Sequence, residues 1–325
     1  MPAATPTSDS SSELERPPLP SRLSPSRMSE FLKCPKSFWY KSILRLPSAP
    51  TVATTRGTLT HTALEELFAH PREERTVEVA LTKIAPAWDE LKSQPSYAAV
   101  VSAEAGDDAT VTGPPPPQDD GDAVPVIDPA KEAELLASVE AMVRNYFAME
   151  RPQAFDPTGL ELRLTADVEG VAVHGIVDRL DTHDSAAGAR VYISDYKTGR
   201  VPKSRFLDDA FFAMKIYAVL VEEALGTPVH ALRLLYLTAG SRDGIYTLEV
   251  NDTLNAMTRK RIKGIATAIR RAHQRDEWPT KTGPLCNWCD FQPICPAFNP
   301  GAEGLGVDLN GSVVGAALPA PRRRR

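Results

Sequence analysis

The amino-acid sequence predicts a layered α/β domain in which helices flank a mixed central β-sheet. Three strand-like runs follow one another between residues 159 and 196, and helical patterns precede and follow them. Strands bracketed by helices indicate separate helical and sheet layers. Because the three consecutive strands form an antiparallel meander among strands that lie between helices, we expect the sheet to be mixed.

The composition bounds the size and class of the protein. With 325 residues, of which 42% are hydrophobic, the chain can bury a full core in one or two domains. It has no run of about 18 apolar residues and it begins with polar residues, so we expect neither a membrane span nor a signal peptide. We therefore expect a cytoplasmic protein with no membrane partner.

Three segments have the composition of disordered chain. Residues 1–20 are rich in Ser, Pro and Thr, residues 98–125 contain four consecutive prolines, and residues 299–325 end in four arginines. Segments of this kind bury too little apolar surface to fold. We expect one folded domain over residues 21–298, with a disordered insertion at about 98–125.

The net charge of -5 conceals two basic regions. Residues 98–130 hold seven acidic side chains and no Lys or Arg, so the rest of the chain sums to +2. Basic residues concentrate between Arg22 and Arg45 and again between Arg259 and Arg275. Either region suits the phosphate backbone of a nucleic acid, although a solvated helix face explains each of them equally well.

The first half of the chain predicts helices. Ser24-Pro25 supplies an N-cap and a first-turn proline, and Cys34-Pro35 interrupts the helix that follows. His61 lies early in the next helix, beside its apolar stripe, where a packed or exposed histidine is the alternative to a metal ligand. Apolar residues at helical spacing predict further helices over residues 56–69, 77–91 and 129–149.

The second half of the chain predicts the sheet. Apolar and polar residues alternate with period two, and Glu169-Gly170 suits a hairpin turn between the first two strands. Strands are expected over residues 159–168, 171–180, 191–196, 229–237 and 245–250, and helices over residues 206–225 and 253–275.

The segment from Gly175 to Arg200 holds the candidate chemistry. Residues two apart on a strand share a face, so Asp195 and Lys197 project together, and the preceding strand lays Asp178 near them. Two carboxylates about 4 Å apart repel by roughly 4 kcal/mol at an effective dielectric near 20, and a hard divalent cation such as Mg²⁺ removes that penalty. The lysine would orient or deprotonate an attacking water. A surface ion pair is the alternative for a lone Asp-x-Lys.

The four cysteines are Cys34, Cys286, Cys289 and Cys295. The last three have the spacing C-x2-C-x5-C, and because three thiols cannot complete a tetrahedral site, the fourth ligand would have to be Cys34. The number of ligands allows a structural Zn²⁺ or a 4Fe-4S cluster, and free buried cysteines are the alternative. Either metal site would staple the N-terminal helix to the C-terminal segment.

Five segments, taken together and in order, identify a family resemblance. They are the opening segment that ends at Cys34-Pro, Gly57-Thr-Leu-Thr-His61, Gly175-Ile-Val-Asp178-Arg-Leu-Asp181, Asp195-Tyr-Lys197-Thr-Gly199 and the terminal cysteine triplet. In these segments the chain resembles the RecB-like exonucleases of the PD-(D/E)XK nuclease superfamily. It is most similar to their iron-sulfur branch, which includes AddB-type nuclease domains and CRISPR-associated adaptation nucleases.

The resemblance implies a restriction-endonuclease-like core and a set of site residues. It implies Asp178, Asp195 and His61 as ligands of Mg²⁺ or Mn²⁺, with the backbone carbonyl of Tyr196 as a further ligand, and Lys197 as the catalytic lysine. It also implies that the four cysteines hold a 4Fe-4S cluster.

Five further residues bear on the same site. Glu161 lies where many relatives carry an active-site glutamate, although a strand-end Glu is also a common surface residue, and Asp181 is expected to be a structural hydrogen-bond partner. Relatives usually have a glutamine four residues before the tyrosine of the next helix, whereas here Ala213 precedes Tyr217. Tyr217 and nearby Lys215 could line the site or pack in the core.

The function that the resemblance implies is metal-dependent hydrolysis of DNA by an exonuclease, on single strands, in DNA repair or recombination. No G-x-x-x-x-G-K-[ST] phosphate loop occurs in these residues, so a helicase partner would be a separate polypeptide. The alternative is a catalytically inactive DNA-binding or adaptor module stapled by iron-sulfur or zinc, which the missing glutamine favours.

Overall fold

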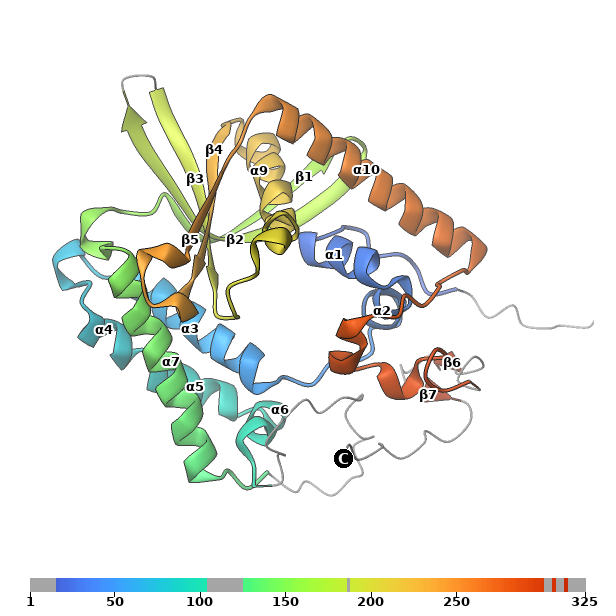
Figure 1. Cartoon of the computed structure of the whole chain (residues 1–325), viewed down its shortest axis with the longest axis horizontal. Coiled ribbons are helices and arrows are strands. Elements are labelled where there is room, and N and C mark those ends of the chain that lie inside the picture. The colour runs from blue at the N-terminus through green and yellow to red at the C-terminus, as the bar shows by residue number, and fades with distance from the viewer. Residues whose placement is uncertain (1–15, 104–124, 186–187, 301–305, 308–312, 315–325) are drawn as a thin grey trace, which may run out of the picture.

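A five-stranded mixed sheet forms the centre of the computed structural model, which describes residues 16–103, 125–185, 188–300, 306–307 and 313–314. The strand order is β1-β2-β3-β4-β5 (Figure 1), and only β3 and β4 run parallel. The α/β class and the mixed sheet predicted from the sequence are therefore confirmed. The strands are β1 (Gly159–Val168), β2 (Val171–Ser185), β3 (Gly188–Lys197), β4 (Val229–Tyr236) and β5 (Ile245–Glu249).

Helices cover both faces of the sheet (Figure 1). The first face carries α1 (Pro25–Lys33), α9 (Phe212–Leu225) and α10 (Asp252–Arg275). The second face carries α3 (Val52–Phe68), α4 (Val77–Thr82), α5 (Ile84–Lys92) and α7 (Pro129–Met149). Shorter helical segments are α2 (Pro35–Phe38), α6 (Pro95–Ala98) and α8 (Leu207–Ala210), together with η1 (Trp39–Ile43), η3 (Ala99–Val101), η7 (Arg242–Gly244), η8 (Pro284–Trp288) and η9 (Gln292–Ile294).

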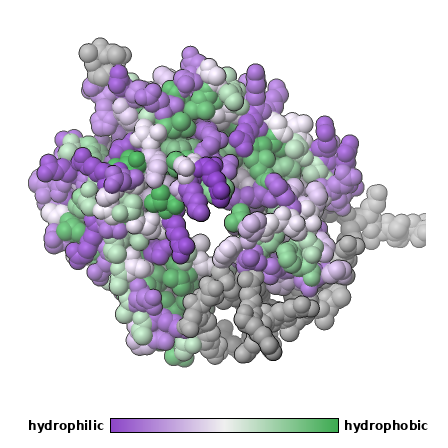
Figure 2. Space-filling model, viewed as in Figure 1, coloured by the Kyte–Doolittle hydropathy of each residue, from purple (hydrophilic) through white to green (hydrophobic). Residues whose placement is uncertain are grey.

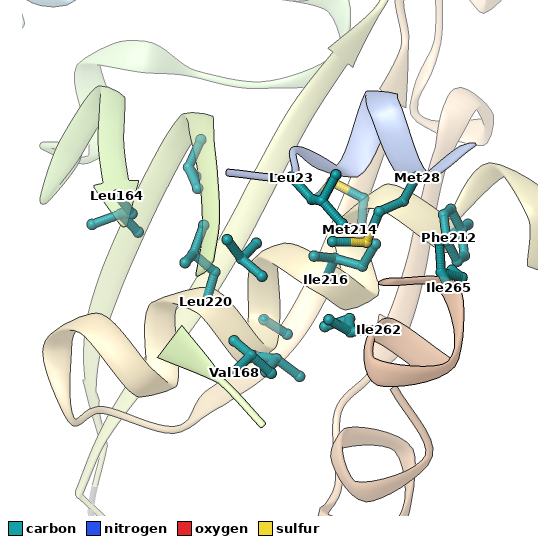
Figure 3. Packing of buried hydrophobic residues seen from close by; sticks show 14 of the residues in the cluster. Leu23, Met28, Leu164, Val168, Phe212, Met214, Ile216, Leu220, Ile262 and Ile265 are labelled. Carbon is teal, nitrogen blue, oxygen red and sulfur yellow. The ribbon is translucent and has the colours of Figure 1, made fainter. Parts of the chain in front are cut away.

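Each face has its own hydrophobic core. On the first face, Met28 of α1, Leu220 of α9 and Ile262 of α10 are fully buried and pack together with the apolar side of β1 and β2 (Figure 3). Burying a side chain of this size contributes about 1.5–3 kcal/mol. The second core joins α3, α5 and α7 to Tyr196 and Leu235 of the sheet. The sheet is therefore held from both sides.

Local signals set where two helices begin. Ser24 caps α1, since its hydroxyl accepts from the backbone N–H of Arg27, and Pro25 occupies the first turn as expected. Thr51 caps α3 by accepting from the backbone N–H of Thr54, so α3 starts a turn earlier than the apolar spacing indicates. The earlier start extends the helix that carries His61.

Two expected helices are broken. The helix predicted over residues 77–91 divides after Thr82, because the ring of Pro86 would clash with the carbonyl of Thr82 in one continuous helix. The helix predicted over residues 206–225 divides at Phe211, which lets Phe211 and its neighbour Phe212 both enter the first core.

The segments expected to be disordered lie mainly outside the described residues. Within the insertion expected at 98–125, η3 is described, and its Val100 and Val101 are buried in the second core. Within the tail expected to be disordered at 299–325, the short strands β6 (Gly306–Val307) and β7 (Val313–Val314) pair with each other. Among the described helices, none combines the length and the hydropathy needed to cross a bilayer.

A buried ion network lies between β2, β3 and α7. The guanidinium of Arg179 is fully buried and donates to both carboxylate oxygens of Glu150, at 2.6 and 3.1 Å, and to Asp181 Oδ2 at 3.0 Å. It also donates to the hydroxyl of Tyr196 at 2.8 Å, and Arg233 gives Glu150 a second partner at 2.8 Å. Asp181 thus has the structural hydrogen bond expected from the sequence.

Arg179→Met should destabilise the protein strongly, because Glu150 and Asp181 would then hold buried charge without their main partner. We expect a loss of about 3–5 kcal/mol in the free energy of unfolding, measured by urea denaturation. Arg163→Met, on the exposed side of β1, is the matched control and should cost under about 1 kcal/mol. Equal losses for the two variants would mean that the network does not support the sheet.

Candidate functional site

The candidate site lies where β1, β2 and β3 pass the middle of α3. The pairing of β1 with β2 skips Glu161 and Asp178, and Glu161 has the unusual backbone angle φ of 42°. Leu160 packs in the second core while Leu162 packs in the first, so the in-and-out alternation of β1 is reset at Glu161. A local irregularity of this kind re-aims a side chain and is frequent next to active sites.

His61 reaches this irregularity from α3. Its Nε2 lies 2.9 Å from the backbone oxygen of Tyr196, and its Nδ1 lies 3.4 Å from Asp178 Oδ2 and 4.0 Å from Glu161 Oε1. In the neutral ring, donation from Nε2 to the carbonyl leaves the Nδ1 lone pair directed at the two carboxylates. A hydrogen bond from the other ring nitrogen to a carbonyl oxygen fixes the tautomer and the orientation of a metal-binding imidazole.

The negative charge of the Asp178 carboxylate is only partly compensated by its surroundings. Burial, followed by the charge of Asp195, raises the pKa of the Asp178 carboxyl from 3.8 to about 7. The backbone N–H of Tyr196 donates to Asp178 Oδ2 at 3.0 Å and opposes that shift only in part. Burial lowers the pKa of His61, but Glu161 and the two aspartates outweigh it and raise the pKa to about 9.

Asp195 and Lys197 form a pair of their own. Lys197 Nζ lies 2.6 Å from Asp195 Oδ2, and Asp195 is only 7% exposed. Burial lowers the pKa of Lys197, but the adjacent Asp195 outweighs it and the net pKa is raised. Lys197 therefore keeps its proton as long as Asp195 remains its partner.

A cleft of about 490 Å³ opens onto His61, Glu161 and Asp178. Tyr217 of α9 lines it, and burial together with the three site carboxylates raises the pKa of the Tyr217 hydroxyl. Gly175 leaves the room for that ring, since a Cβ there would lie 2.6 Å from Tyr217 Cε1. Lys215 instead forms an ion pair with Asp208, and Ala213 is half-buried on the same helix.

Glu65 is a lining residue that the sequence analysis did not single out. It follows His61 by four residues, so both project from one side of α3. The four-residue spacing from His61 is the feature of the sequence that could have identified Glu65 as a lining residue. Other lining residues of the cleft are Gly57, Thr58 and Ile176.

The donor set suits a hard divalent cation. His61, Glu161 and Asp178 each offer one ligand atom, and these atoms all lie within 4.8 Å of one another. Mg²⁺ and Mn²⁺ favour carboxylate oxygens, and imidazole is compatible with Mn²⁺. Asp195 adjoins this group through Asp178 but faces Lys197, and the Tyr196 carbonyl is engaged by His61. The structure thus gathers three of the expected residues most tightly.

The four cysteines lie in the part of the molecule where the C-terminal segment packs against the N-terminal helices. Tyr40 donates to the carbonyl of Ile294 at 2.7 Å, and Phe291 packs on Tyr40 within a small apolar cluster. Burial raises the pKa of the Cys289 thiol to about 11, with smaller contributions from Cys295 and Cys34.

The cysteines are free and half-buried. In the described part of the chain, none of them belongs to a group of three ligand atoms within 4.8 Å of one another. The apolar cluster and its hydrogen bonds, rather than a gathered set of thiols, are what the structure shows joining the two ends of the domain.

Comparison with known proteins agrees with this geometry. A sequence model of the PD-(D/E)XK nuclease superfamily matches residues 22–296. That span includes the cleft residues and all four cysteines. No curated protein matches the chain.

Binding of Mn²⁺ should stabilise the protein in a pH-dependent manner. Metal ligands must be deprotonated, so protons compete with the metal at His61 as the pH falls through about 9 and at Asp178 as it falls through about 7. At a Mn²⁺ concentration 100 times the dissociation constant at pH 8, the metal should add about 2.7 kcal/mol to the free energy of unfolding at that pH. The same concentration should add far less at pH 5.5, measured by urea unfolding with and without chelator.

Two further expectations sharpen that test. Without metal, the protonated Asp178 carboxyl contributes to the free energy of unfolding. That contribution is fully present below about pH 4 and is lost as the pH rises through the raised pKa of Asp178. Asp178→Asn should abolish the Mn²⁺ effect, whereas the exposed control Asp209→Asn should retain it. A Mn²⁺ effect of the same size in Asp178→Asn would show that the ion binds elsewhere.

Proposed function

The chain belongs to the PD-(D/E)XK nuclease superfamily, and from that membership we propose that it is a Mg²⁺- or Mn²⁺-dependent exonuclease of the RecB-like branch that hydrolyses DNA, preferentially single strands. The observation that carries this proposal is the convergence of His61, Glu161 and Asp178 beside the Asp195–Lys197 pair. A half-buried acidic cluster with an adjacent ammonium suits the cleavage of a phosphodiester in the presence of a divalent cation.

Each residue would have a definite task. His61 and Asp178 would hold the cation, with Glu161 and Asp195 as further oxygen donors. The Tyr196 carbonyl, which the resemblance also implies as a ligand, would have to release His61 Nε2 before it could join them. When bound, a divalent cation polarises the scissile phosphate and lowers the pKa of water.

Lys197 would assist the reaction from its position beside Asp195, next to the proposed metal ligands. With Asp195 as a ligand of the cation, Lys197 would be placed beside the metal site to orient the attacking water or to offset charge on the phosphate.

The proposed family branch, the proposed DNA substrate and the proposed partners are supported by the sequence resemblance. The motifs around His61, Asp178 and Lys197, together with the four cysteines, support the RecB-like branch, and its activities support single-stranded DNA and a role in repair or recombination. A helicase, where one takes part, would lie outside these 325 residues, which contain no phosphate-binding loop of the motor type.

A 4Fe-4S cluster held by Cys34, Cys286, Cys289 and Cys295 is part of the proposal. Tetrahedral Zn²⁺ with Zn–S bonds near 2.3 Å would bring its sulfurs to within about 3.8 Å of one another. In the described residues no three cysteine sulfurs lie within 4.8 Å of one another, and the choice of iron-sulfur over zinc rests on the sequence resemblance. The cluster would fasten the C-terminal segment to α2 in addition to the Tyr40 contacts.

The cofactor can be identified by purification without oxygen. We expect a brown protein with visible absorption near 400 nm (about that of thiolate-bound iron-sulfur clusters) and about four iron atoms per chain by metal analysis. Cys34→Ser should remove both signals. A colourless protein with one zinc per chain would instead assign the cysteines to zinc.

Cleavage should require Lys197 and Asp195. Labelled single-stranded DNA with Mn²⁺ should be degraded by the wild type, and Lys197→Ala should lower the rate by about 10²–10⁴-fold while DNA binding persists. Lys203→Ala, at an exposed lysine after the same strand, is the control and should leave the rate unchanged.

The same assay separates the enzyme from the inactive adaptor that Ala213 would favour. A wild-type protein that binds DNA but never cleaves it, with no effect of chelator, would establish the adaptor. A fully active Lys197→Ala protein would refute the role of the lysine.

A further inference from the structure

The exposed face of α10 forms a hollow with basic side chains on its rim. The hollow has a volume of about 530 Å³ and is lined by Lys260, Lys263, Gly264, Thr267, Ala268 and Arg271. These positions follow helical spacing, so they lie on one side of α10. Hydrophilic side chains project along the edge of the molecule where α10 runs (Figures 1 and 2).

The charge on this helix is one-sided. Between residues 253 and 275 there are seven Lys or Arg and no Asp or Glu, although the whole chain has a net charge of -5. The opposite side of α10 is apolar and buried through Ile262, Ile265 and Ile269. All of the positive charge therefore faces outward or toward the helix flanks.

Several of these cations have partners, but the rim retains an excess. Arg259 pairs with Glu222 and Glu223, and Arg261 stacks on Phe212. Lys263 is 3.6 Å from Glu169, in an exposed pair that contributes little.

Among the described residues, no ion pair engages Lys260, Arg270 or Arg271, and each of the three is exposed. These three side chains therefore concentrate positive charge on the exposed side of α10, and Glu169 is the one acidic partner that the described ion pairs give to the rim.

We propose that this face of α10 binds the phosphate backbone of the nucleic-acid substrate at a distance from the cleft. The floor of the hollow is made of small residues, and a Cβ added at Gly264 would meet nothing within 4 Å, so a phosphate group can come close to the helix between the cations. Lysine and arginine at this spacing neutralise successive phosphates without reading sequence. The inference rests on the proposed function in that the substrate is a polyanion.

The position of α10 fits that role. α10 packs on α9, and α9 carries Tyr217 at the cleft. Lys263 at the hollow lies 3.6 Å from Glu169, directly after β1 and eight residues from Glu161 of the site, so at about 3.3 Å per strand residue the hollow is roughly 25 Å from the site. A strand that extends from the cleft around α9 would contact both surfaces, whereas a very short oligonucleotide would occupy the cleft alone.

The test is binding of fluorescein-labelled dT30 in EDTA, which prevents cleavage, followed by fluorescence anisotropy between 50 and 200 mM salt. The variant Lys260→Gln/Lys263→Gln/Arg271→Gln should bind dT30 more weakly, and its slope of log affinity against log salt should be smaller by about two, since each phosphate contact on a single strand contributes about 0.7. The kcat for dT6 should be unchanged and the KM for dT30 raised.

Matched variants exclude a general effect of charge. Arg144→Gln/Arg151→Gln/Arg242→Gln removes three exposed cations near α7, over the other face of the sheet, and should bind dT30 like the wild type. A third protein, Lys260→Arg/Lys263→Arg/Arg271→Lys, keeps the charge and should keep the affinity.

Three results would overturn the proposal: equal losses in the two glutamine triples, an unchanged salt slope in the α10 triple, or displacement of dT30 by poly-glutamate at equal charge concentration, which would assign the face to an acidic protein. Because binding is measured without metal, a wild type that binds dT30 through α10 yet never cleaves would refute the catalytic proposal alone.

Discussion

The central physical constraint is the proximity of two buried carboxylates, Asp178 and Asp195, at neighbouring positions of β2 and β3. Burial and the nearby charge of Asp195 oppose the ionisation of Asp178, as the raised pKa of Asp178 records. The chain meets that cost with directed donors, which are the Tyr196 backbone N–H, the His61 ring and the Lys197 ammonium. None of these donors alone offsets all of the site carboxylates, and a divalent cation bound there would supply further positive charge.

The rest of the fold holds this arrangement in place. Directly behind the site, the hydroxyl of Tyr196 accepts from Arg179, while its backbone N–H and carbonyl serve Asp178 and His61. One residue therefore links the buried ion network to the metal-binding face. The first core fixes α9, which carries Tyr217, and the second core fixes α3, which carries His61. Displacement of either helix would separate donors that come from four elements.

Much of the fold could be predicted from the sequence, because period-two alternation and capping residues act locally. The β2–β3 hairpin that lays Asp178 beside Asp195 follows from such local patterns. The irregularity at Glu161 could not be predicted, since its positive φ depends on how β1 meets α3 and β2. The helix breaks at Pro86 and Phe211 were not predicted, because apolar residues continue at helical spacing across both positions and favour one continuous helix in each case. The buried charge of Arg179 depends on Glu150, whose approach only the tertiary fold determines.

Anomalous diffraction from crystals of the protein soaked in Mn²⁺ would test the central claim most directly. The account predicts one strong peak within coordination distance of His61 Nδ1 and a carboxylate oxygen of Asp178, with Glu161 or Asp195 completing the oxygen ligands. An empty cluster at saturating Mn²⁺ and neutral pH, or a peak only at surface carboxylates, would contradict it.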